Sequence, residues 1–187
     1  MAPKWRAYVS GDDAFGFSNG VRVASFWELK QALLTLPEDV INNNVGEGKN
    51  DIAAWVESVL GDKEMAEEMR KYSHRWGMIV ALERQMMRTL ELPDYVARRW
   101  MRKVDRPFSF MSGEVVGSIE DLGQMLEKLS DETIAFHCER YPNDMAVWVV
   151  DIVGDYELAE LLNEATSRMQ MKRFVDDHLE MLKEAAE

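Results

Sequence analysis

The sequence predicts an α+β protein, mainly α, that consists of two tandem copies of a small module. The stretch Asn50-Asp51-Ile52-Ala53-Ala54-Trp55-Val56 returns 93 positions later as Asn143-Asp144-Met145-Ala146-Val147-Trp148-Val149. The same register runs without a gap over residues 15–69 and 108–162, with roughly 20 identities in about 55 pairs. Each copy begins with alternating apolar residues around a glycine and continues with apolar residues at helical spacing. We therefore expect a β-hairpin and three or four helices in each module.

The repeat places the module boundaries near the middle of the chain. We predict a first module over residues 1–92, a basic connecting helix within 93–107 and a second module over 108–187. The alternation of apolar residues from Trp5 to Val9 predicts a short strand at the start of the first module.

A hairpin and a capped helix open each copy. Asn19-Gly20 and Ser112-Gly113 lie within short apolar alternations, which is typical of a tight turn whose glycine has a positive φ. Ser25 and Ser118 follow, each in position to cap a helix. The apolar face of that helix carries three leucines in each copy, Leu29, Leu33 and Leu36 in the first and Leu122, Leu126 and Leu129 in the second.

A short second helix is predicted from Pro37 and from Ser130, since proline and the acids that follow suit a helix N-terminus. In the second copy a strand is the alternative, because Ile134, Phe136 and Cys138 alternate.

The repeated Asn-Asp pair is predicted to cap a third helix, which ends at Gly61 in the first copy and at Gly154 in the second. The aspartate after each glycine can cap a fourth helix. Beyond it the copies diverge in sequence, but helical patterns continue to about Thr89 and from about Ser167 to Glu184.

Charge is distributed unevenly along the 187 residues, whose net charge is −12. Residues 1–69 carry a net charge of −6, residues 70–106 carry +6 and residues 107–187 carry −12. The single cysteine excludes an internal disulfide and fits a reducing cytoplasm. The N-terminal residues do not resemble a signal peptide, and no apolar run is long enough to span a membrane. We expect an acidic, cytoplasmic protein.

The basic middle of the chain contains the strongest candidate for an interaction surface. Asp94 is predicted to cap a connecting helix that runs to Val104 and carries Val96, Trp100 and Val104 as an apolar stripe. RNA phosphates could bind its arginines, with Trp100 available for base stacking. The alternative is a solvated helix whose arginines pair with carboxylates of the second copy. The candidate surface comprises Arg98, Arg99, Trp100, Arg102, Lys103 and Arg106.

The second copy also resembles a known family. It reads Phe136-His137-Cys138, then Asn143-Asp144-Met145-Ala146-x-Trp148-Val149, then Gly154-Asp155-x-Glu157-Leu158-Ala159. This pattern resembles the DUF5752-like proteins, small archaeal and bacterial domains of unknown function, whose core reads Phe-x-x-His-Val, Asn-Asp-Phe-Ala-x-Trp and Leu-Ala. The resemblance covers most of residues 108–162 and, more loosely, 15–69. It implies a compact, mostly helical fold and no established activity.

The sequence departs from the family pattern at two points. Met145 and Ile52 replace the usual aromatic residue after Asn-Asp, and Asn44 stands where the second copy has His137. A histidine can activate a neighbouring cysteine, but His137 and Cys138 on one helix would point about 100° apart. We therefore expect His137 to be buried and hydrogen-bonded rather than catalytic, and Cys138 to be a small apolar filler.

Metal and cofactor signatures are absent from the sequence. None of the three histidines, His74, His137 and His178, has a second ligand at helical spacing. Gly46-x-Gly48-Lys49 lacks the glycine spacing and hydroxyl of a phosphate-binding loop, so a plain loop is predicted there. We predict no catalytic, cofactor-binding or metal-binding residues.

The residues of the repeated motif are predicted to be mainly structural. The Asn-Asp pairs suit helix capping, and the tryptophans suit core anchoring. These residues are Asn50, Asp51, Trp55, His137, Asn143, Asp144 and Trp148.

Together these patterns favour a non-catalytic intracellular interaction or regulatory protein that binds another protein. The first alternative is an RNA- or ribosome-associated factor that binds through residues 98–106. The second alternative is an enzyme that uses His137 and Cys138. Association of the chain with itself is compatible with the sequence, and no membrane partner is expected.

Overall fold

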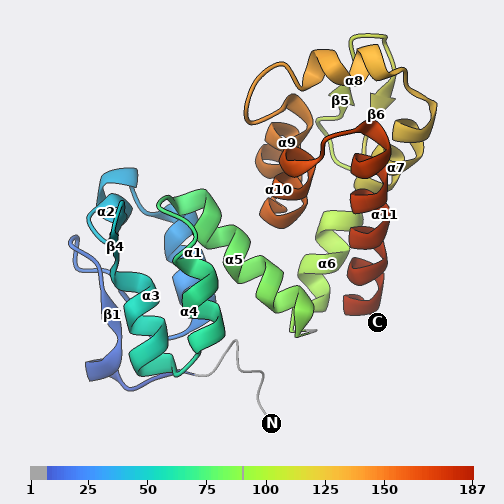
Figure 1. The fold of residues 1–187 in the computed structure, drawn as a ribbon. Helices are drawn as coiled ribbons and strands as arrows, with labels where there is room; N and C mark the ends of the chain where they lie inside the picture. The colour runs from blue at the N-terminus through green and yellow to red at the C-terminus, as the bar shows by residue number, and fades with distance from the viewer. Residues whose placement is uncertain (1–7, 90) are drawn as a thin grey trace. The chain divides into compact units, whose positions relative to one another are not determined.

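The computed structural model describes residues 8–89 and 91–187, which are mainly helical and include three two-stranded antiparallel hairpins (Figure 1). The chain divides into two compact units, Met1–Glu91 and Leu92–Glu187, which we call unit 1 and unit 2. In the part of the chain that the structure describes, no helix has the length and apolar character needed to cross a membrane.

Unit 1 contains two hairpins and five helices among its described residues. The elements before the second hairpin are the 3₁₀ turn η2 (Gly11–Asp13), β1 (Phe15–Gly16), β2 (Arg22–Val23), α1 (Phe26–Thr35) and α2 (Glu38–Asn42). The second hairpin and the remaining elements are β3 (Val45–Gly46), β4 (Lys49–Asn50), α3 (Asp51–Trp55), the π-helical turn η3 (Val56–Leu60), α4 (Lys63–Met69) and α5 (Arg75–Arg88). The core forms where α5 packs against α1, α2 and α4.

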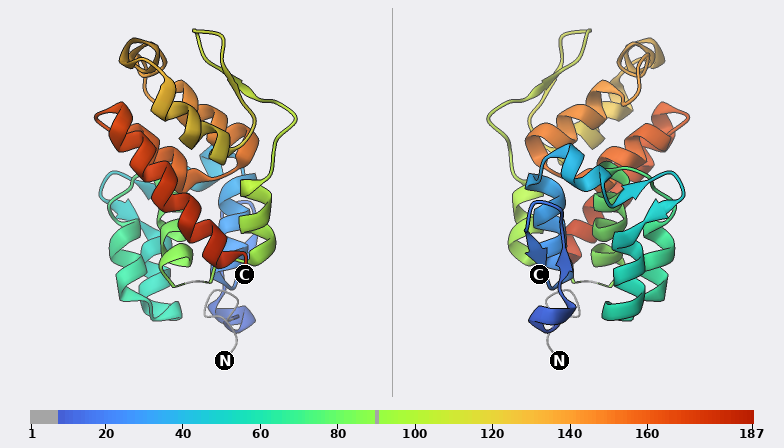
Figure 2. Two further views of the ribbon diagram at one scale, coloured as in Figure 1. Left: turned by 90° about the vertical axis from the view of Figure 1, so that its right-hand side faces the viewer. Right: turned by 90° about the vertical axis from the view of Figure 1, so that its left-hand side faces the viewer.

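Unit 2 contains one hairpin and six helices. It begins with α6 (Asp94–Met101), β5 (Phe108–Ser109), β6 (Val115–Val116), α7 (Ile119–Lys128) and α8 (Asp131–His137). It continues with α9 (Asp144–Trp148), the π-helical turn η4 (Val149–Val153), α10 (Tyr156–Glu164) and α11 (Arg168–Ala185). The long helix α11 forms one side of the unit (Figures 1 and 2) and packs against α6, α7 and α10.

The elements of the two units correspond in order and position. Eight elements of unit 2 begin 93 residues after an element of unit 1, namely β5, β6, α7, α8, α9, η4, α10 and α11 after β1, β2, α1, α2, α3, η3, α4 and α5. The correspondence therefore extends to α5 and α11, where the sequence similarity has already ended. The β3–β4 hairpin has no counterpart in unit 2.

Serine caps begin the first long helix of each unit, as predicted. The hydroxyl of Ser25 accepts a hydrogen bond from the amide of Glu28 (3.2 Å), and that of Ser118 accepts one from Asp121 (3.0 Å). The two acids in turn accept a hydrogen bond from the amide just before the cap, at Ala24 and at residue 117. These reciprocal bonds satisfy amides that have no partner within the helix.

The asparagine of the repeated motif makes two different bonds in each unit. In unit 2, Oδ1 of Asn143 accepts from the amide of Ala146 (2.9 Å), and its Nδ2 donates to the carbonyl of Leu162 at the end of α10 (2.9 Å). In unit 1, Asn50 bonds in the same way to Ala53 (2.9 Å) and to the carbonyl of residue 69 (3.0 Å). An aspartate could supply the cap but not the donor, which explains why the motif uses asparagine.

The repeated tryptophans are buried in both units, as predicted. Trp55 is 7% exposed, and its Nε1 donates to the carbonyl of Asp13 (2.8 Å). Trp148 is 6% exposed, and its Nε1 donates to the carbonyl of Arg106 (3.0 Å). Each indole therefore anchors the segment that precedes the first hairpin of its own unit.

The helix pairs α1–α5 and α7–α11 are held together by different chemistry. Lys30 of α1 forms a buried ion pair with Glu83 of α5 (2.6 Å). The corresponding position in unit 2 is Gly123, where a Cβ atom would lie 3.0 Å from Cγ1 of Val175 on α11. Unit 1 thus uses paired charges where unit 2 uses close packing of backbone against side chain.

Several sequence-based expectations need correction. Residues 131–137 form helix α8, so the alternative strand at Ile134–Cys138 is wrong, because the helix is capped by Ser130 and closed by main-chain bonds. The loop at Gly46–Lys49 is part of the β3–β4 hairpin, with Gly48 at a φ of 71°. The predicted N-terminal strand falls largely outside the described residues. Neither π-helical turn was predicted, because its i→i+5 bonds leave no periodicity signal in five residues.

Candidate functional site

Helix α6 presents its arginines to solvent and buries its apolar residues in unit 2. Val96, Ala97 and Trp100 are buried, with Trp100 fully inaccessible, because α6 packs against α11 and α7. The expectation that Trp100 is available for base stacking is therefore wrong. The helix begins at Asp94 after Pro93 and ends at Met101, so Asp94 is not its cap and Val104 lies beyond it.

Two of the five basic residues of the candidate surface pair with carboxylates. Nε of Arg98 lies 3.5 Å from Oδ2 of Asp94, and its guanidinium also donates to the carbonyl of Ala186. Nζ of Lys103 lies 3.8 Å from Oδ2 of Asp121. Only the Lys103 contact reaches an acid of the second copy, because Asp94 belongs to α6 itself, so neither contact pairs an arginine with a carboxylate of the second copy as the alternative expected.

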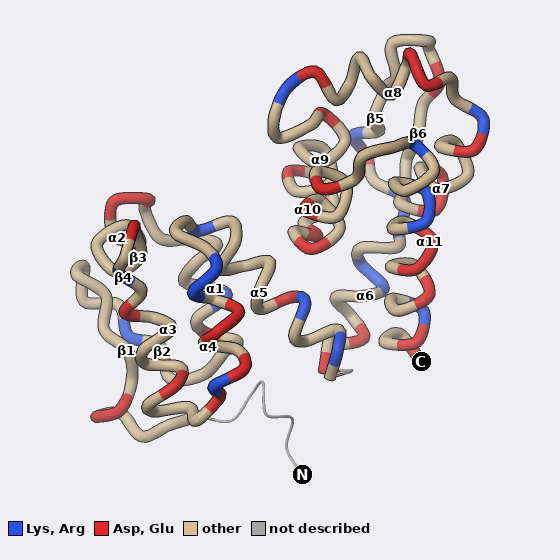
Figure 3. Tube along the Cα trace, in the orientation of Figure 1, with Lys and Arg blue, Asp and Glu red and all other residues tan. Residues whose placement is uncertain are grey.

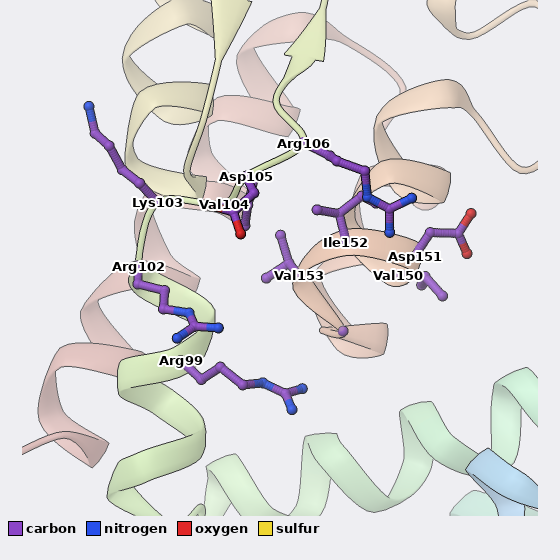
Figure 4. A pocket seen from close by; sticks show the side chains of 11 residues that line it. Arg99, Arg102, Lys103, Val104, Asp105, Arg106, Val150, Asp151, Ile152 and Val153 are labelled. Atoms are coloured by element: carbon purple, nitrogen blue, oxygen red, sulfur yellow. The ribbon is translucent and has the colours of Figure 1, made fainter.

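The other three cationic residues line a groove. Arg99, Arg102 and Arg106 are exposed, and within the described residues no ion pair joins them to a carboxylate. Their groove has a volume of about 510 Å³ and lies between the stretch 99–106 and η4. Figure 4 shows the three side chains extending toward the η4 side, whereas Lys103 points away. We call this hollow the basic groove; its wall on the η4 side is formed by Val150, Asp151, Ile152, Val153 and Gly154.

The floor of the basic groove is shaped by Gly154, which ends the π-helical turn with a φ of 86°. A Cβ atom at this glycine would lie 2.8 Å from Nη2 of Arg99, so the absence of a side chain lets the guanidinium approach the backbone. In unit 1 the corresponding Gly61 has a φ of 70°, but no atom of the described residues lies within 4 Å of a Cβ built there. Among these residues the close approach is therefore found at Gly154 and not at Gly61.

The basic groove is positive although the chain as a whole is acidic. Its lining includes four cationic side chains and two carboxylates, those of Asp105 and Asp151. Figure 3 shows basic residues gathered on α6, and acidic residues spread over α10 and α11. In unit 1 the position of Arg106 is taken by Asp13, whose carbonyl accepts the corresponding indole bond. Unit 1 therefore carries the opposite charge at the equivalent place.

His137 lies outside the basic groove and links three segments of unit 2. The amide of Met111 donates to its Nε2 (3.0 Å), and its Nδ1 lies 3.0 Å from Oδ2 of Asp144. Because Nε2 accepts a bond, Nδ1 carries the proton and donates to the carboxylate. Arg140 donates to the other oxygen of Asp144 (2.7 Å). This arrangement occupies both ring nitrogens and leaves no lone pair to act as a general base.

Two further features of this cluster argue for a structural role. A hydrogen bond from Arg140, together with that from His137, holds the pKa of Asp144 below its usual value. Burial, together with the nearby carboxylate of Asp144, raises the pKa of the Cys138 thiol. A nucleophilic cysteine needs the opposite shift. In unit 1, Asn44 replaces the histidine and donates instead to the carbonyl of Val40 (3.1 Å).

Other hollows have fewer unpaired charges. Hollows of about 360 Å³ beside Asn50 and about 250 Å³ beside Asn143 lie at corresponding places in the two units. Their arginines are already paired, Arg70 with Glu57 (2.5 Å) and Arg140 with Asp144. Among the residues with described positions, no group of three or more His, Cys, Asp or Glu side chains is arranged to hold a metal ion.

Comparison with known proteins identifies the family. Residues 17–139 match the model described as Family of unknown function (DUF5752). The chain belongs to this family. The DUF5752 match runs through most of unit 1 and into unit 2 and ends before Asn143, rather than coinciding with either predicted copy. No curated protein and no solved structure matches the chain.

The DUF5752 match includes the whole cationic side of the basic groove but not its opposite wall. Residues 99–106 lie inside the matched region and residues 150–154 lie outside it. Sequence reasoning identified the arginines from their charge but missed the wall formed by η4. The only sequence signal there was the helix-ending Gly154, which does not indicate what lies against it.

Proposed function

We propose that the protein is a non-catalytic interaction protein whose basic groove binds an acidic partner protein. The observation that carries this proposal is that Arg99, Arg102 and Arg106 are exposed, line one groove and form no ion pair with a carboxylate of the described residues. Asp105 and Asp151 line the same groove, yet among the described residues no ion pair joins either of them to these arginines. Electrostatic complementarity to a partner is a physical reason for these arginines to form no ion pair within the chain.

We further propose that the two units derive from duplication of one module and have diverged in surface charge. The common offset of eight elements supports this origin. The shared asparagine and tryptophan bonds support a common scaffold. Divergence would then give one unit a basic groove and the other an acidic segment at the same place, while the core of each unit stays the same.

RNA binding is the second candidate function, and the exposed arginines are the observation that favours it. Two features count against it. Trp100 is buried, and no aromatic side chain of the described residues lines the basic groove, so these residues offer no surface for base stacking there. The acidic surface of the rest of the chain also opposes long-range attraction of a nucleic acid.

The proposal is tested by neutralising the groove in the full chain. The variant Arg99→Gln/Arg102→Gln/Arg106→Gln should lose partner proteins that the native chain retains from lysate, whereas Arg98→Gln should retain them. Arg98 is an exposed arginine of α6 that does not line the groove, so this variant controls for the loss of a nearby arginine outside the groove. Equal retention by all three proteins would overturn the groove as the binding site. Retention that depends on RNA, and is lost after ribonuclease treatment, would favour the second candidate.

A further inference from the structure

We infer that the basic groove recognises a phosphoryl group on a protein segment, that is, a phosphoserine or phosphothreonine of the partner. This inference rests on the proposed function and specifies the chemistry of the ligand. Four features of the groove support it, namely the kind of cation present, the charge of the arginines, the position of the two carboxylates and the fixed backbone beside the arginines.

The cations that line the groove toward η4 are all arginines. Arg99, Arg102 and Arg106 extend on the same side, while the one lysine points away (Figure 4). A guanidinium presents donors in a planar fork that matches two oxygens of a phosphate at once, whereas an ammonium acts as a point charge. Three such forks in one lining provide more donors than the two oxygens of a single carboxylate can accept.

The charge of the three arginines also favours a dianion. Their guanidiniums extend toward η4, whereas Lys103 points away and pairs with Asp121. A phosphoserine carries about −1.5 to −2 at neutral pH, whereas a glutamate or aspartate side chain carries −1. The arginines therefore attract a phosphoryl group more strongly than a single carboxylate.

The two carboxylates argue against a long polyanion. Asp105 and Asp151 belong to the lining on opposite sides, one beside the arginines and one on η4. Successive phosphates of a nucleic acid strand would meet these acids, and like charges repel. A lone phosphoryl group can lie between the arginines while its uncharged flanking residues pass the acids. Val104, Val150 and Ile152 are half-buried in the lining and offer apolar surface to such flanking residues.

The backbone beside the arginines is fixed by contacts within unit 2. The carbonyl of Arg106 accepts the indole bond of Trp148, and the guanidinium of Arg99 lies over the backbone of Gly154. A fixed backbone limits the positions open to the exposed guanidiniums and so lowers the entropy that binding must offset. The volume of about 510 Å³ leaves room for a phosphorylated side chain and part of its neighbours.

The experiment uses the full chain labelled with ¹⁵N and three capped pentapeptides that differ only at the centre. The central residue is phosphoserine, glutamate or serine, and valine flanks it on both sides. Binding is followed by NMR through the backbone amides of residues 99–106 and 150–154 and through the arginine Nε–H signals. The phosphoserine peptide should bind at least about tenfold more tightly than the glutamate peptide, which corresponds to about 1.4 kcal/mol. The serine peptide should show no saturable shift.

Two variants and one change of pH sharpen the test. Arg99→Gln/Arg102→Gln/Arg106→Gln should weaken phosphoserine binding at least tenfold, while Arg98→Gln should change it less than about twofold.

The second pKa of phosphoserine is near 6, so the dianion fraction rises about fourfold between pH 5.5 and 7.5. Affinity for the phosphoserine peptide should rise by a similar factor over that range, and affinity for the glutamate peptide should stay constant.

The outcomes separate this inference from the proposed function. If the glutamate peptide binds as tightly as the phosphoserine peptide, the inference fails and the acidic-partner proposal stands. If inorganic phosphate alone binds as tightly as the phosphopeptide, recognition of a protein segment fails. If a single-stranded RNA oligonucleotide binds more tightly than every peptide, the phosphoryl inference and the acidic-partner proposal both fail, and RNA binding becomes the favoured function. If none of these probes shifts the groove signals, the inference fails and the acidic-partner proposal loses its binding site.

Discussion

Gly154 lies directly beneath Arg99, with 2.8 Å between the position of a glycine Cβ and Nη2 of the arginine. The glycine that ends η4 thus leaves space for the guanidinium of a residue on α6, although the two residues are far apart in the sequence. Two independent requirements meet at this glycine. One is its positive φ of 86°, and the other is the space that the guanidinium fills.

Gly154→Ala and Gly61→Ala should separate these two requirements. Both glycines have a positive φ, so each alanine should lower the free energy of unfolding by about 1–2 kcal/mol. Only Gly154→Ala should displace Arg99, because only there does the new methyl group meet the guanidinium. We expect similar urea midpoints for the two variants, and several-fold weaker phosphoserine-peptide binding for Gly154→Ala alone. Unchanged peptide binding in Gly154→Ala would show that the position of Arg99 does not matter.

Trp148→Phe should weaken both unit 2 and the groove. The substitution removes the Nε1 donor to the carbonyl of Arg106 while keeping an aromatic ring in the core. Leaving that carbonyl without its partner should cost about 1–2 kcal/mol. Trp55→Phe removes the corresponding bond to Asp13 and should cost a similar amount without changing peptide binding. Denaturant unfolding measures the change in stability, and the peptide titration measures the change in binding. A loss of binding in Trp55→Phe would contradict the assignment of the binding site to the basic groove of unit 2.

Asn143→Asp should be destabilising even though aspartate is a good helix cap. The new carboxylate keeps the acceptor for Ala146 but loses the donor to Leu162 and lies against that carbonyl oxygen. Because the side chain is buried, we expect a loss of about 2–3 kcal/mol in the free energy of unfolding. Ser167→Ala, which removes only a cap at α11, should cost about 1 kcal/mol. A cost for Asn143→Asp no larger than for Ser167→Ala would mean that the second bond contributes nothing.

His137→Ala should release the β5–β6 hairpin from α9. The imidazole joins the amide of Met111 to Asp144 and packs against Phe108 and Phe110. We expect a loss of about 3 kcal/mol, from the cavity and the unpaired amide together. His137→Phe keeps a ring but removes both bonds, so it isolates the hydrogen-bonding part. Hydrogen exchange at the Met111 amide should accelerate in both variants, and unchanged exchange would show that the bond to Nε2 is unimportant.

Cys138 should react slowly with iodoacetamide in the folded chain. Burial and Asp144 raise its pKa above that of an ordinary thiol, so less thiolate is present at pH 7. The alkylation rate should keep rising with pH beyond the point where the urea-unfolded chain, which serves as the control, levels off. Fast alkylation at pH 7 that His137→Ala abolishes would instead reveal an activated thiol and favour an enzyme.

The local features of the fold could be predicted because the residues that produce them are close together in the sequence. Ser25, Ser118 and the Asn-Asp pairs cap helices through bonds that span three residues, and Gly154 ends a helix through its own φ. The offset of 93 residues predicted which elements would correspond, and the structure extends that register to α5 and α11. Such patterns depend on neighbours along the chain, which a sequence displays directly.

The second bond of Asn143, the burial of Trp100 and the wall of the basic groove were decided by tertiary structure. The sequence by itself determined that five cations lie within residues 98–106, but not which of them meet a carboxylate and which remain open. That outcome depends on α6 packing against α11, which turns Trp100 inward, and on η4 lying across from the arginines about 50 residues later. Packing between segments distant in sequence leaves no periodic trace in either segment, so only the folded chain shows the groove.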